Sequence, residues 1–252
     1  ATMLRVRWTQ DKRRLRAMAP VTISKAAREG VEVVKVDSLS ALDRLDGITI
    51  VRAPMASGKT QKVARPWVEK AIEARWTHDP KTGLPVEVEG WRGIWAICHR
   101  VTLVEELAQR LTLLSYRSDN PATNRAAVCL PSITLDPFAR WFPDYLFIDE
   151  IQQVLRFLRS QECCRTAKAR TPDKVFDRLV EVVRRAKGVL VADAGADDAV
   201  IQFLRYCRPL DPIRLVEMAE PEDAGIEAVG SSGDKGGGGP AVDRAAAGLH
   251  KG

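Results

Sequence analysis

The chain has 252 residues, of which 45% are hydrophobic and 29% charged, and its formal net charge is +6. This composition excludes a disordered or fibrous protein. No segment reaches the roughly 20 uncharged apolar residues that a membrane-spanning helix needs. Its five cysteines form no C-x-x-C pair, which indicates reduced thiols rather than disulfides or a zinc site. We therefore expect a cytoplasmic protein without a membrane partner, and the positive charge is compatible with a polyanion.

Residues 1–45 are predicted to form an N-terminal basic arm followed by short elements. The arm contains the run Lys12–Arg16, and position 1 is not Met, which suggests a fragment or a processed chain. Residues 17–30 have weak helical periodicity, and Val31–Val36 is β-branched enough to form a strand. Asp37 or Ser38 is expected to cap a short helix that reaches Leu42.

Residues 46–219 are predicted to form the main domain, in which strands alternate with helices. The strands are apolar along nearly their whole length, which is typical of a parallel sheet covered by helices on both faces, an α/β fold. A polar stretch with Pro and Gly at 77–91 indicates a surface insertion or hairpin. The expected strands are 48–51, 94–98, 126–130, 145–148 and 188–193, and the expected helices include 101–113, 154–158 and 175–185.

Residues 220–252 are rich in Gly, Ala, Asp and Ser and include four consecutive glycines at 236–239. Such a segment buries too little apolar surface to offset its chain entropy. We expect a disordered Gly-rich tail.

A P-loop pattern follows the strand at 48–51. The residues expected to hold phosphate are Ala53, Pro54, Ala56, Ser57, Gly58, Lys59 and Thr60. Backbone N–H groups at a helix start favour phosphate, Lys59 is expected to reach the β- and γ-phosphates, and the Thr60 hydroxyl to bind Mg²⁺. The sequence therefore predicts binding of ATP with Mg²⁺.

An acidic pair, Asp149 and Glu150, follows the strand at 145–148. The ends of parallel strands meet at one edge of a sheet, so this pair is expected beside the P-loop. Asp149 would bind Mg²⁺, directly or through water, and Glu150 would polarise the attacking water. Gln152 would sense the γ-phosphate.

Together the P-loop and Asp149-Glu150-Ile151-Gln152 resemble motifs I and II of superfamily-two (DEAD-like) helicases. The segment Cys98–Leu103 resembles their motif Ia. With Cys129–Ile133 and Ala192-Asp193-Ala194, the resemblance narrows to origin-of-replication-binding-protein helicases and cyanobacterial-type plasmid replication proteins. It spans about residues 46–200 and implies the first RecA-like domain, a P-loop NTPase fold.

The resemblance also implies roles for other residues. His99, Arg100, Thr102 and Ser132 would contact the nucleic-acid backbone, and Asp193 would couple hydrolysis to strand movement. The chain departs from the family at Ala56, where these helicases usually have Gly, and at Gly195 and Ala196 after the coupling residue. Ala53 in place of the usual first Gly is a variation that the family allows.

The expected function is therefore that of the ATP-binding domain of a plasmid or viral-type DNA replication helicase, acting on single-stranded DNA, with RNA left open. A complete helicase also needs a second RecA-like domain, in cis or in trans, so we expect the chain alone to bind ATP weakly, hydrolyse it slowly and unwind nothing. Two alternatives stay open. One is an ATP-dependent nucleic-acid-binding switch without unwinding activity, and the other is a P-loop kinase, for which Arg156 and Arg159 are the nearest lid residues.

Overall fold

The computed structural model describes residues 23–118, 123–160, 163 and 171–218. Contacts divide the chain into two units, 1–220 and 221–252, and all described residues belong to the first. The basic run at 12–16 and the expected Gly-rich tail lie outside the described residues.

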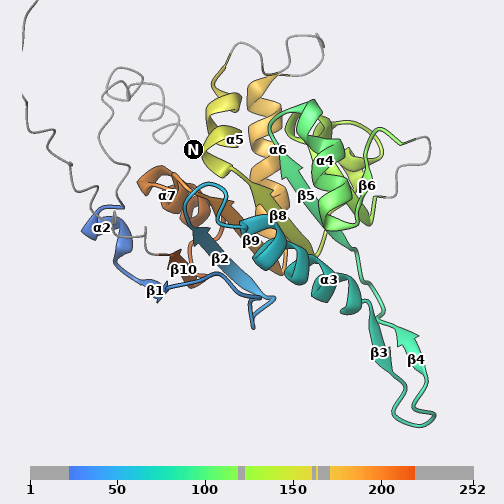
Figure 1. Ribbon diagram of the computed structural model, residues 1–252. Coiled ribbons are helices and arrows are strands. Elements are labelled where there is room, and N and C mark those ends of the chain that lie inside the picture. The colour runs from blue at the N-terminus through green and yellow to red at the C-terminus, as the bar shows by residue number, and fades with distance from the viewer. Residues whose placement is uncertain (1–22, 119–122, 161–162, 164–170, 219–252) are drawn as a thin grey trace, which may run out of the picture. The chain divides into compact units, whose positions relative to one another are not determined.

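A single parallel sheet organises the described chain (Figure 1). Its eight strands lie in the order β1-β10-β2-β9-β8-β5-β7-β6, and every neighbouring pair is parallel. The strands are β1 (Val31–Val36), β2 (Gly47–Arg52), β5 (Ile94–Cys98), β6 (Leu114–Ser115), β7 (Arg125–Cys129), β8 (Tyr145–Asp149), β9 (Gly188–Asp193) and β10 (Ile213–Met218).

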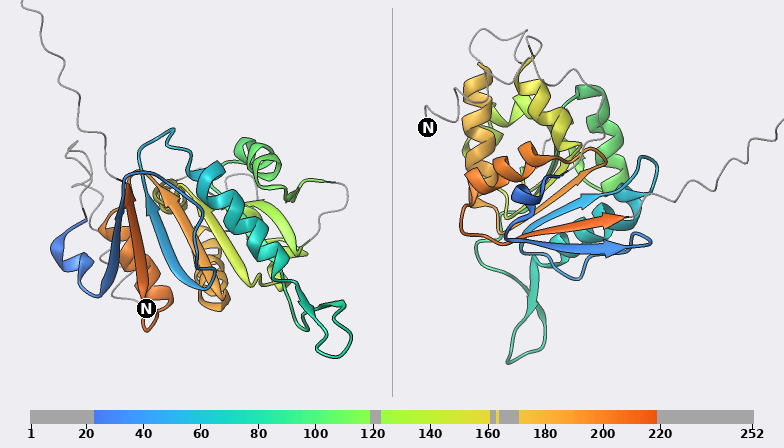
Figure 2. Two further views of the ribbon diagram at one scale, coloured as in Figure 1. Left: turned by 60° about the horizontal axis from the view of Figure 1, so that its bottom comes forward. Right: turned by 90° about the vertical axis from the view of Figure 1, so that its left-hand side faces the viewer.

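Helices cover both faces of this sheet, as the apolar strands predict (Figure 2). The apolar side chains of α3 (Arg65–Glu73) and α4 (Val101–Leu111) pack on one face. Those of α2 (Lys25–Arg28), α5 (Ile151–Leu158), α6 (Pro172–Arg185) and α7 (Asp198–Cys207) pack on the other. The observed architecture confirms the predicted fold class, an α/β parallel sheet with helices on both faces. None of the helices described is long and apolar enough to cross a membrane.

Three local predictions differ from the structure. The helix expected after Asp37 is absent, because residues 37–46 form bends and loop that return the chain from β1 to β2. Strand β10 was not expected, although it pairs with both β1 and β2. The strand expected at 126–130 stops at Cys129, since Leu130 already begins the 3-10 helix η3 (Leu130–Thr134), whose second residue is Pro131.

The N-terminal strand belongs to the same sheet as the P-loop strand. β1 pairs in register with β10 from Val31↔Ile213 to Val36↔Met218, and β10 pairs with β2. The boundary expected between residues 45 and 46 therefore does not separate β1 from the main sheet.

The polar insertion at 77–91 contains a hairpin, as its composition predicts. β3 (Trp76–His78) pairs antiparallel with β4 (Pro85–Glu87), and the pair projects away from the sheet (Figures 1 and 2). Short 3-10 turns, η3 and η4 (Phe138–Arg140), connect β7 to β8.

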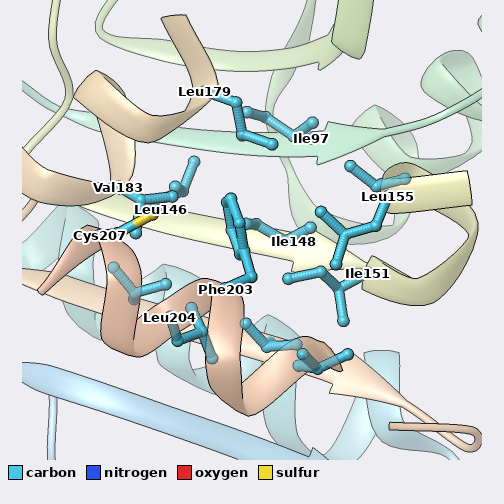
Figure 3. Close-up of a cluster of buried hydrophobic side chains, with 14 of the residues drawn as sticks. Ile97, Leu146, Ile148, Ile151, Leu155, Leu179, Val183, Phe203, Leu204 and Cys207 are labelled. Atoms are coloured by element: carbon cyan, nitrogen blue, oxygen red, sulfur yellow. The ribbon is translucent and has the colours of Figure 1, made fainter. Parts of the chain in front are cut away.

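An apolar cluster fixes the helices beneath the centre of the sheet (Figure 3). Side chains from β5 and β8 point towards side chains from α5, α6 and α7. Because protein interiors are close-packed, such contacts leave the carboxyl ends of these strands little freedom to move. The labelled members are Ile97, Leu146, Ile148, Ile151, Leu155, Leu179, Val183, Phe203, Leu204 and Cys207.

A buried carboxylate joins the amino-terminal ends of the central strands. The Asp144 side chain is fully buried, and its Oδ2 accepts a hydrogen bond of 2.7 Å from the Arg92 backbone N–H. Its Oδ1 lies 3.0 Å from Arg92 Nη2 and 3.6 Å from Lys187 Nζ. Its backbone carbonyl accepts from the N–H of Lys187 and of Gly188. Asp144 therefore links the starts of β5, β8 and β9.

We predict that Asp144→Ala lowers the free energy of unfolding by about 2–4 kcal/mol, because it removes the buried acceptor that binds the Arg92 backbone N–H and guanidinium and pairs with Lys187. Asp136→Ala is the matched control, since the Asp136 side chain is 62% exposed and pairs only with Arg140 four residues on; it should cost less than about 1 kcal/mol. Urea unfolding followed by circular dichroism measures both. Equal losses in the two variants would contradict this role for Asp144.

Candidate nucleotide-binding site

The ends of four parallel strands meet at one edge of the sheet. In register, Arg52 of β2 lies beside Asp193 of β9, and Ala192 lies beside Asp149 of β8. Ile148 of β8 lies beside Ile97 of β5. The P-loop, the acidic pair and the segment after β5 therefore leave the sheet along one line, where α/β proteins bind ligands.

The P-loop runs from the end of β2 into a helical segment. Gly58 adopts φ +86°, a left-handed conformation, and a Cβ built there would lie 3.3 Å from the Lys62 side chain. The chain then enters η2 (Lys59–Ala64), a π-helical turn that continues into α3. The first-turn N–H groups of such a segment have no intrahelical acceptor, so they are available to an anion.

Ala56 adopts φ +60°, the left-handed region that glycine favours. This is one of the positions at which the sequence departs from the helicase pattern that it resembles. The backbone therefore has the shape that a glycine would take, and the methyl group adds a local cost of about 1–2 kcal/mol. The next residue, Ser57, has a buried Oγ that finds no hydrogen-bond partner among the described residues.

The Lys59 ammonium lies inside the loop. Nζ donates hydrogen bonds of 2.8 Å to the carbonyl oxygens of Ala53 and Pro54. Burial lowers the pKa of Lys59, while the charges of Asp193, Asp149 and Glu150 act in the opposite direction. One cation is thus placed within electrostatic reach of three carboxylates from two neighbouring strands.

The acidic pair occupies the last position of β8 and the turn that follows. Burial, reinforced by the charge of Glu150, raises the pKa of Asp149 to about 6, and Lys59 opposes that rise. Glu150 has φ +49° and ψ +58°, and its N–H donates a 2.8 Å hydrogen bond to the Ala192 carbonyl. This left-handed residue turns the chain so that α5 begins at the next position.

Asp193 holds the start of α5 against the end of β9. Its Oδ2 accepts a 2.8 Å hydrogen bond from the Gln152 N–H, and its Oδ1 accepts one of 2.7 Å from the Gly195 N–H. A Cβ on Gly195 would lie 2.8 Å from Gln152 Oε1, so a side chain there would displace Gln152. Packing against Gln152 explains why this chain has Gly195 where its resemblance to helicases does not predict it.

The four expected nucleic-acid contacts divide into an exposed and a buried pair. Arg100 and Thr102, at the start of α4, are exposed. His99 is 8% exposed and its ring lies against Phe157, with 6.4 Å between centroids, whereas Ser132 is 5% exposed within η3. Only the exposed pair can meet a nucleic acid without rearrangement.

A buried arginine that the motifs did not predict supports this edge. Arg178 of α6 donates to the backbone carbonyls of Ile133 and Phe138, and its guanidinium lies 3.9 Å from the centre of the Phe142 ring. It therefore fixes the segment that carries Ser132. The helical spacing of Val175, Arg178, Leu179 and Val182 did place this arginine on the buried side of the helix.

The residues present fit a magnesium-bound phosphate. The loop offers first-turn N–H groups and one lysine ammonium, and hard oxygen ligands come from the Thr60 hydroxyl and the Asp149 carboxylate. Mg²⁺ suits oxygen ligands and needs few from the protein, because it keeps water and binds substrate phosphates. η2 contacts β9, the strand next to β8, so these groups belong to one region.

Neither a protein-family model nor a curated protein sequence matches this chain. Among solved structures it is similar to Dbp5 of S. cerevisiae in a complex with Nup159, Gle1, IP6 and ADP, at 13% identity and a TM-score of 0.43 over 86% of this chain and 52% of that one. It is also similar to Mss116p bound to ssRNA and AMP-PNP, at 13% identity and a TM-score of 0.44 over 69% of this chain and 37% of that one. The chain thus spans about half of the length of the Dbp5 chain and a smaller share of the Mss116p chain.

We predict that Asp149→Asn stabilises the ligand-free protein at pH 7.5. The folded pKa near 6 lies above the ordinary 3.8, so the folded state binds more protons between these values, and stability falls as pH rises through them. The variant should gain about 1–3 kcal/mol at pH 7.5, and its advantage should shrink as the pH falls to 4.5.

Thermal unfolding in EDTA at both pH values measures this difference. Asp43→Asn is the control, because Arg214 lowers the pKa of that exposed carboxyl and removal of its charge should not stabilise the fold. If Asp149→Asn is no more stable than wild type at pH 7.5, that result would contradict the conclusion that the charged Asp149 carboxylate destabilises the fold.

Proposed function

We propose that this chain is a helicase-type ATPase domain that binds and hydrolyses ATP while acting on nucleic acid. One observation carries the proposal: Lys59 of the P-loop lies within electrostatic reach of Asp149 and Glu150. The P-loop follows β2, and the two carboxylates follow from the end of β8, which is two strands away from β2 in the sheet. Neither half of this arrangement is specific alone. Together they provide a phosphate cradle, a metal ligand and a base at one edge.

The loop residues would bind the triphosphate. Backbone N–H groups from Ser57 to Thr60 would cradle the phosphates, with Ala53, Pro54 and Ala56 shaping the turn. Lys59 would leave the loop carbonyls that it contacts in this structure and pair with the β- and γ-phosphate oxygens. Thr60 and Asp149 would hold Mg²⁺, which supplies neutralisation of phosphate charge when bound.

Glu150 would accept a proton from the attacking water, and its left-handed backbone aims it from the sheet edge. Gln152 lies two residues further on, in the first turn of α5, and has a buried Nε2 with no partner among the described residues, so it is suited to sense the γ-phosphate. Asp193 bonds the N–H groups of Gln152 and Gly195, and would transmit a change at the acidic pair to the chain after β9.

The proposed polymer is single-stranded DNA, with RNA as the other possibility. Arg100 and Thr102 are exposed beside the acidic strand end, and arginine and hydroxyl groups bind phosphates without regard to base sequence. The finer proposal, a role in plasmid or viral-type DNA replication, rests on the motif resemblance at Cys98–Leu103 and Ala192–Ala194. A second RecA-like domain, in cis or in trans, would supply the arginine that completes hydrolysis.

A switch that binds nucleotide and nucleic acid without unwinding is the second candidate. The observation that favours it is Ala56, whose methyl group occupies a glycine-like conformation at the phosphate cradle. Such strain would weaken ATP binding or slow turnover without removing the site.

We predict that Lys59→Ala weakens MgATP binding by at least about tenfold, because it removes the only cation of the loop that lies among these carboxylates. Lys70→Ala is the control, since Nζ of Lys70, on the same helical segment, binds the Asp43 carbonyl instead. Titration with labelled ATP measures both. Unchanged affinity in the Lys59 variant would overturn the assignment of the site.

We further predict that Glu150→Gln binds MgATP with wild-type affinity within about threefold and hydrolyses it at least about 100-fold more slowly, because the amide cannot accept a proton. Single-turnover assays with single-stranded DNA, single-stranded RNA or neither also test the polymer. Stimulation of wild-type hydrolysis by one of them supports a helicase-type ATPase. Binding of ATP and nucleic acid with no hydrolysis at all supports the switch.

A further inference from the structure

A buried histidine lies next to the proposed catalytic glutamate and lacks a hydrogen-bond partner. His99 is 8% exposed, and its Nδ1 finds no partner among the residues that the structure describes. An unpaired buried polar atom costs about 1–3 kcal/mol. Nearly all such atoms in native proteins are paired, so one that is not needs an explanation.

Strand register places this histidine beside Glu150. Ile97 of β5 lies opposite Ile148 of β8, and His99 and Glu150 each follow two residues later, at the first position past the end of their strands. The two residues also interact electrostatically, because the charge of Glu150 acts on the His99 imidazole. His99 and Glu150 therefore follow the ends of two neighbouring parallel strands, within electrostatic reach of each other.

The backbone on both sides is held, so only the side chains are free to adjust. The His99 carbonyl accepts from Cys129 Sγ, 3.7 Å away on the neighbouring strand, and the imidazole ring lies against Phe157 of α5. Glu150 is fixed through its N–H to Ala192 and by the helix that begins at the next residue. A rotation of the Glu150 side chain is the small change that could bring its carboxylate to the imidazole.

We propose that His99 is a positioning residue that donates a hydrogen bond from Nδ1 to the Glu150 carboxylate and so aims it at the attacking water. This inference rests on the proposed function, because it gives Glu150 its orientation in that reaction. It also reassigns His99, which the motif resemblance alone would place on the nucleic acid.

The environment of the imidazole suits this task. Burial is the main effect on its pKa and lowers it, so the ring stays neutral at physiological pH and offers one N–H donor and one acceptor nitrogen. A neutral N–H donor orients a carboxylate without neutralising its negative charge, so the carboxylate can still act as a base. The next residue, Arg100, is exposed at the start of α4, so a polymer bound there would act one peptide unit away from this hydrogen bond.

The first test observes the imidazole nitrogens of the full chain by NMR, which is practical because the sequence has three histidines. Spectra are compared for wild type, Glu150→Gln and Glu106→Gln, each ligand-free and with Mg²⁺ and a non-hydrolysable ATP analogue. His99→Asn identifies the His99 signals by their loss. Glu106 is exposed on α4 and pairs with Arg110, so its variant is the matched control.

We expect Glu150→Gln to shift the His99 nitrogen signals in at least one of the two states and to leave those of His78 and His250 unchanged. Glu106→Gln should shift none of the three. If the chemical shifts of the His99 nitrogens are the same in wild type and Glu150→Gln in both states, the proposal is overturned.

The second test is kinetic and uses two variants, one close to histidine in size but without a donor and one that is smaller but keeps a donor. His99→Leu removes the donor, and His99→Asn retains one near the position of Nδ1. We expect His99→Leu to lower the single-turnover hydrolysis rate about 10- to 100-fold while the Kd for ATP stays within about twofold, and His99→Asn to recover most of the loss. If the His99→Asn variant folds and binds ATP but hydrolyses it as slowly as His99→Leu, that result would argue against a hydrogen bond.

The alternative role of His99 gives a different pattern. If the imidazole contacts nucleic acid, the His99→Leu variant should bind a single-stranded oligonucleotide more weakly than wild type. It should then hydrolyse ATP at the wild-type rate once the oligonucleotide is saturating. This pattern would overturn the inference. Failure of the proposed function is separate, because it would show as unaltered ATP binding in Lys59→Ala. In that case the ligand-free spectra still decide whether His99 and Glu150 are bonded.

Discussion

Backbone pairing between parallel strands is the constraint on which the site depends. It fixes the register of β2, β9, β8 and β5, and with it the relative positions of residues far apart in the sequence. The residues of the site gather because their strands end at one edge; they are Lys59, His99, Glu150 and Asp193. Lys59 and Asp193 lie together there although they are 134 positions apart in the sequence (193 − 59). Apolar packing below the sheet and Asp144 at its opposite end keep those strands in place.

The site combines three carboxylates with one loop cation, and this imbalance has chemical meaning. Burial of Asp149, reinforced by repulsion from Glu150, disfavours the charged carboxylate, which is why the pKa of Asp149 rises to about 6. A magnesium-bound phosphate would bring positive metal charge to the carboxylates and negative phosphate charge to Lys59. The charges of these protein groups do not balance by themselves, and binding of a magnesium-bound phosphate would compensate them.

Sequence reasoning succeeded where periodicity and local chemistry act together. Continuous apolar runs predicted strands such as β5 and β8, because both of their faces are buried. The glycine and charge pattern predicted a P-loop and an acidic pair; the structure places these residues at the ends of β2 and β8, and their chemical roles remain predictions from the sequence. It missed β10, whose charged residues Arg214 and Glu217 interrupt the apolar run; these find ion-pair partners in Asp43 and Arg28. It also could not distinguish buried His99 from exposed Arg100, because neighbouring residues at a strand end differ in burial only once the adjacent helix is in place.

The position of β10 has a consequence for the order in which the domain assembles. β10 lies between β1 and β2, so among the strands that the structure describes, the one at 31–36 has no partner until residues 213–218 exist. During synthesis, the first strand of the sheet must wait for the last one, with 182 residues (213 − 31) between the paired positions Val31 and Ile213. Contacts that are so distant in sequence form late and slowly, so β1 is left exposed as an unpaired strand throughout translation of the rest of the domain.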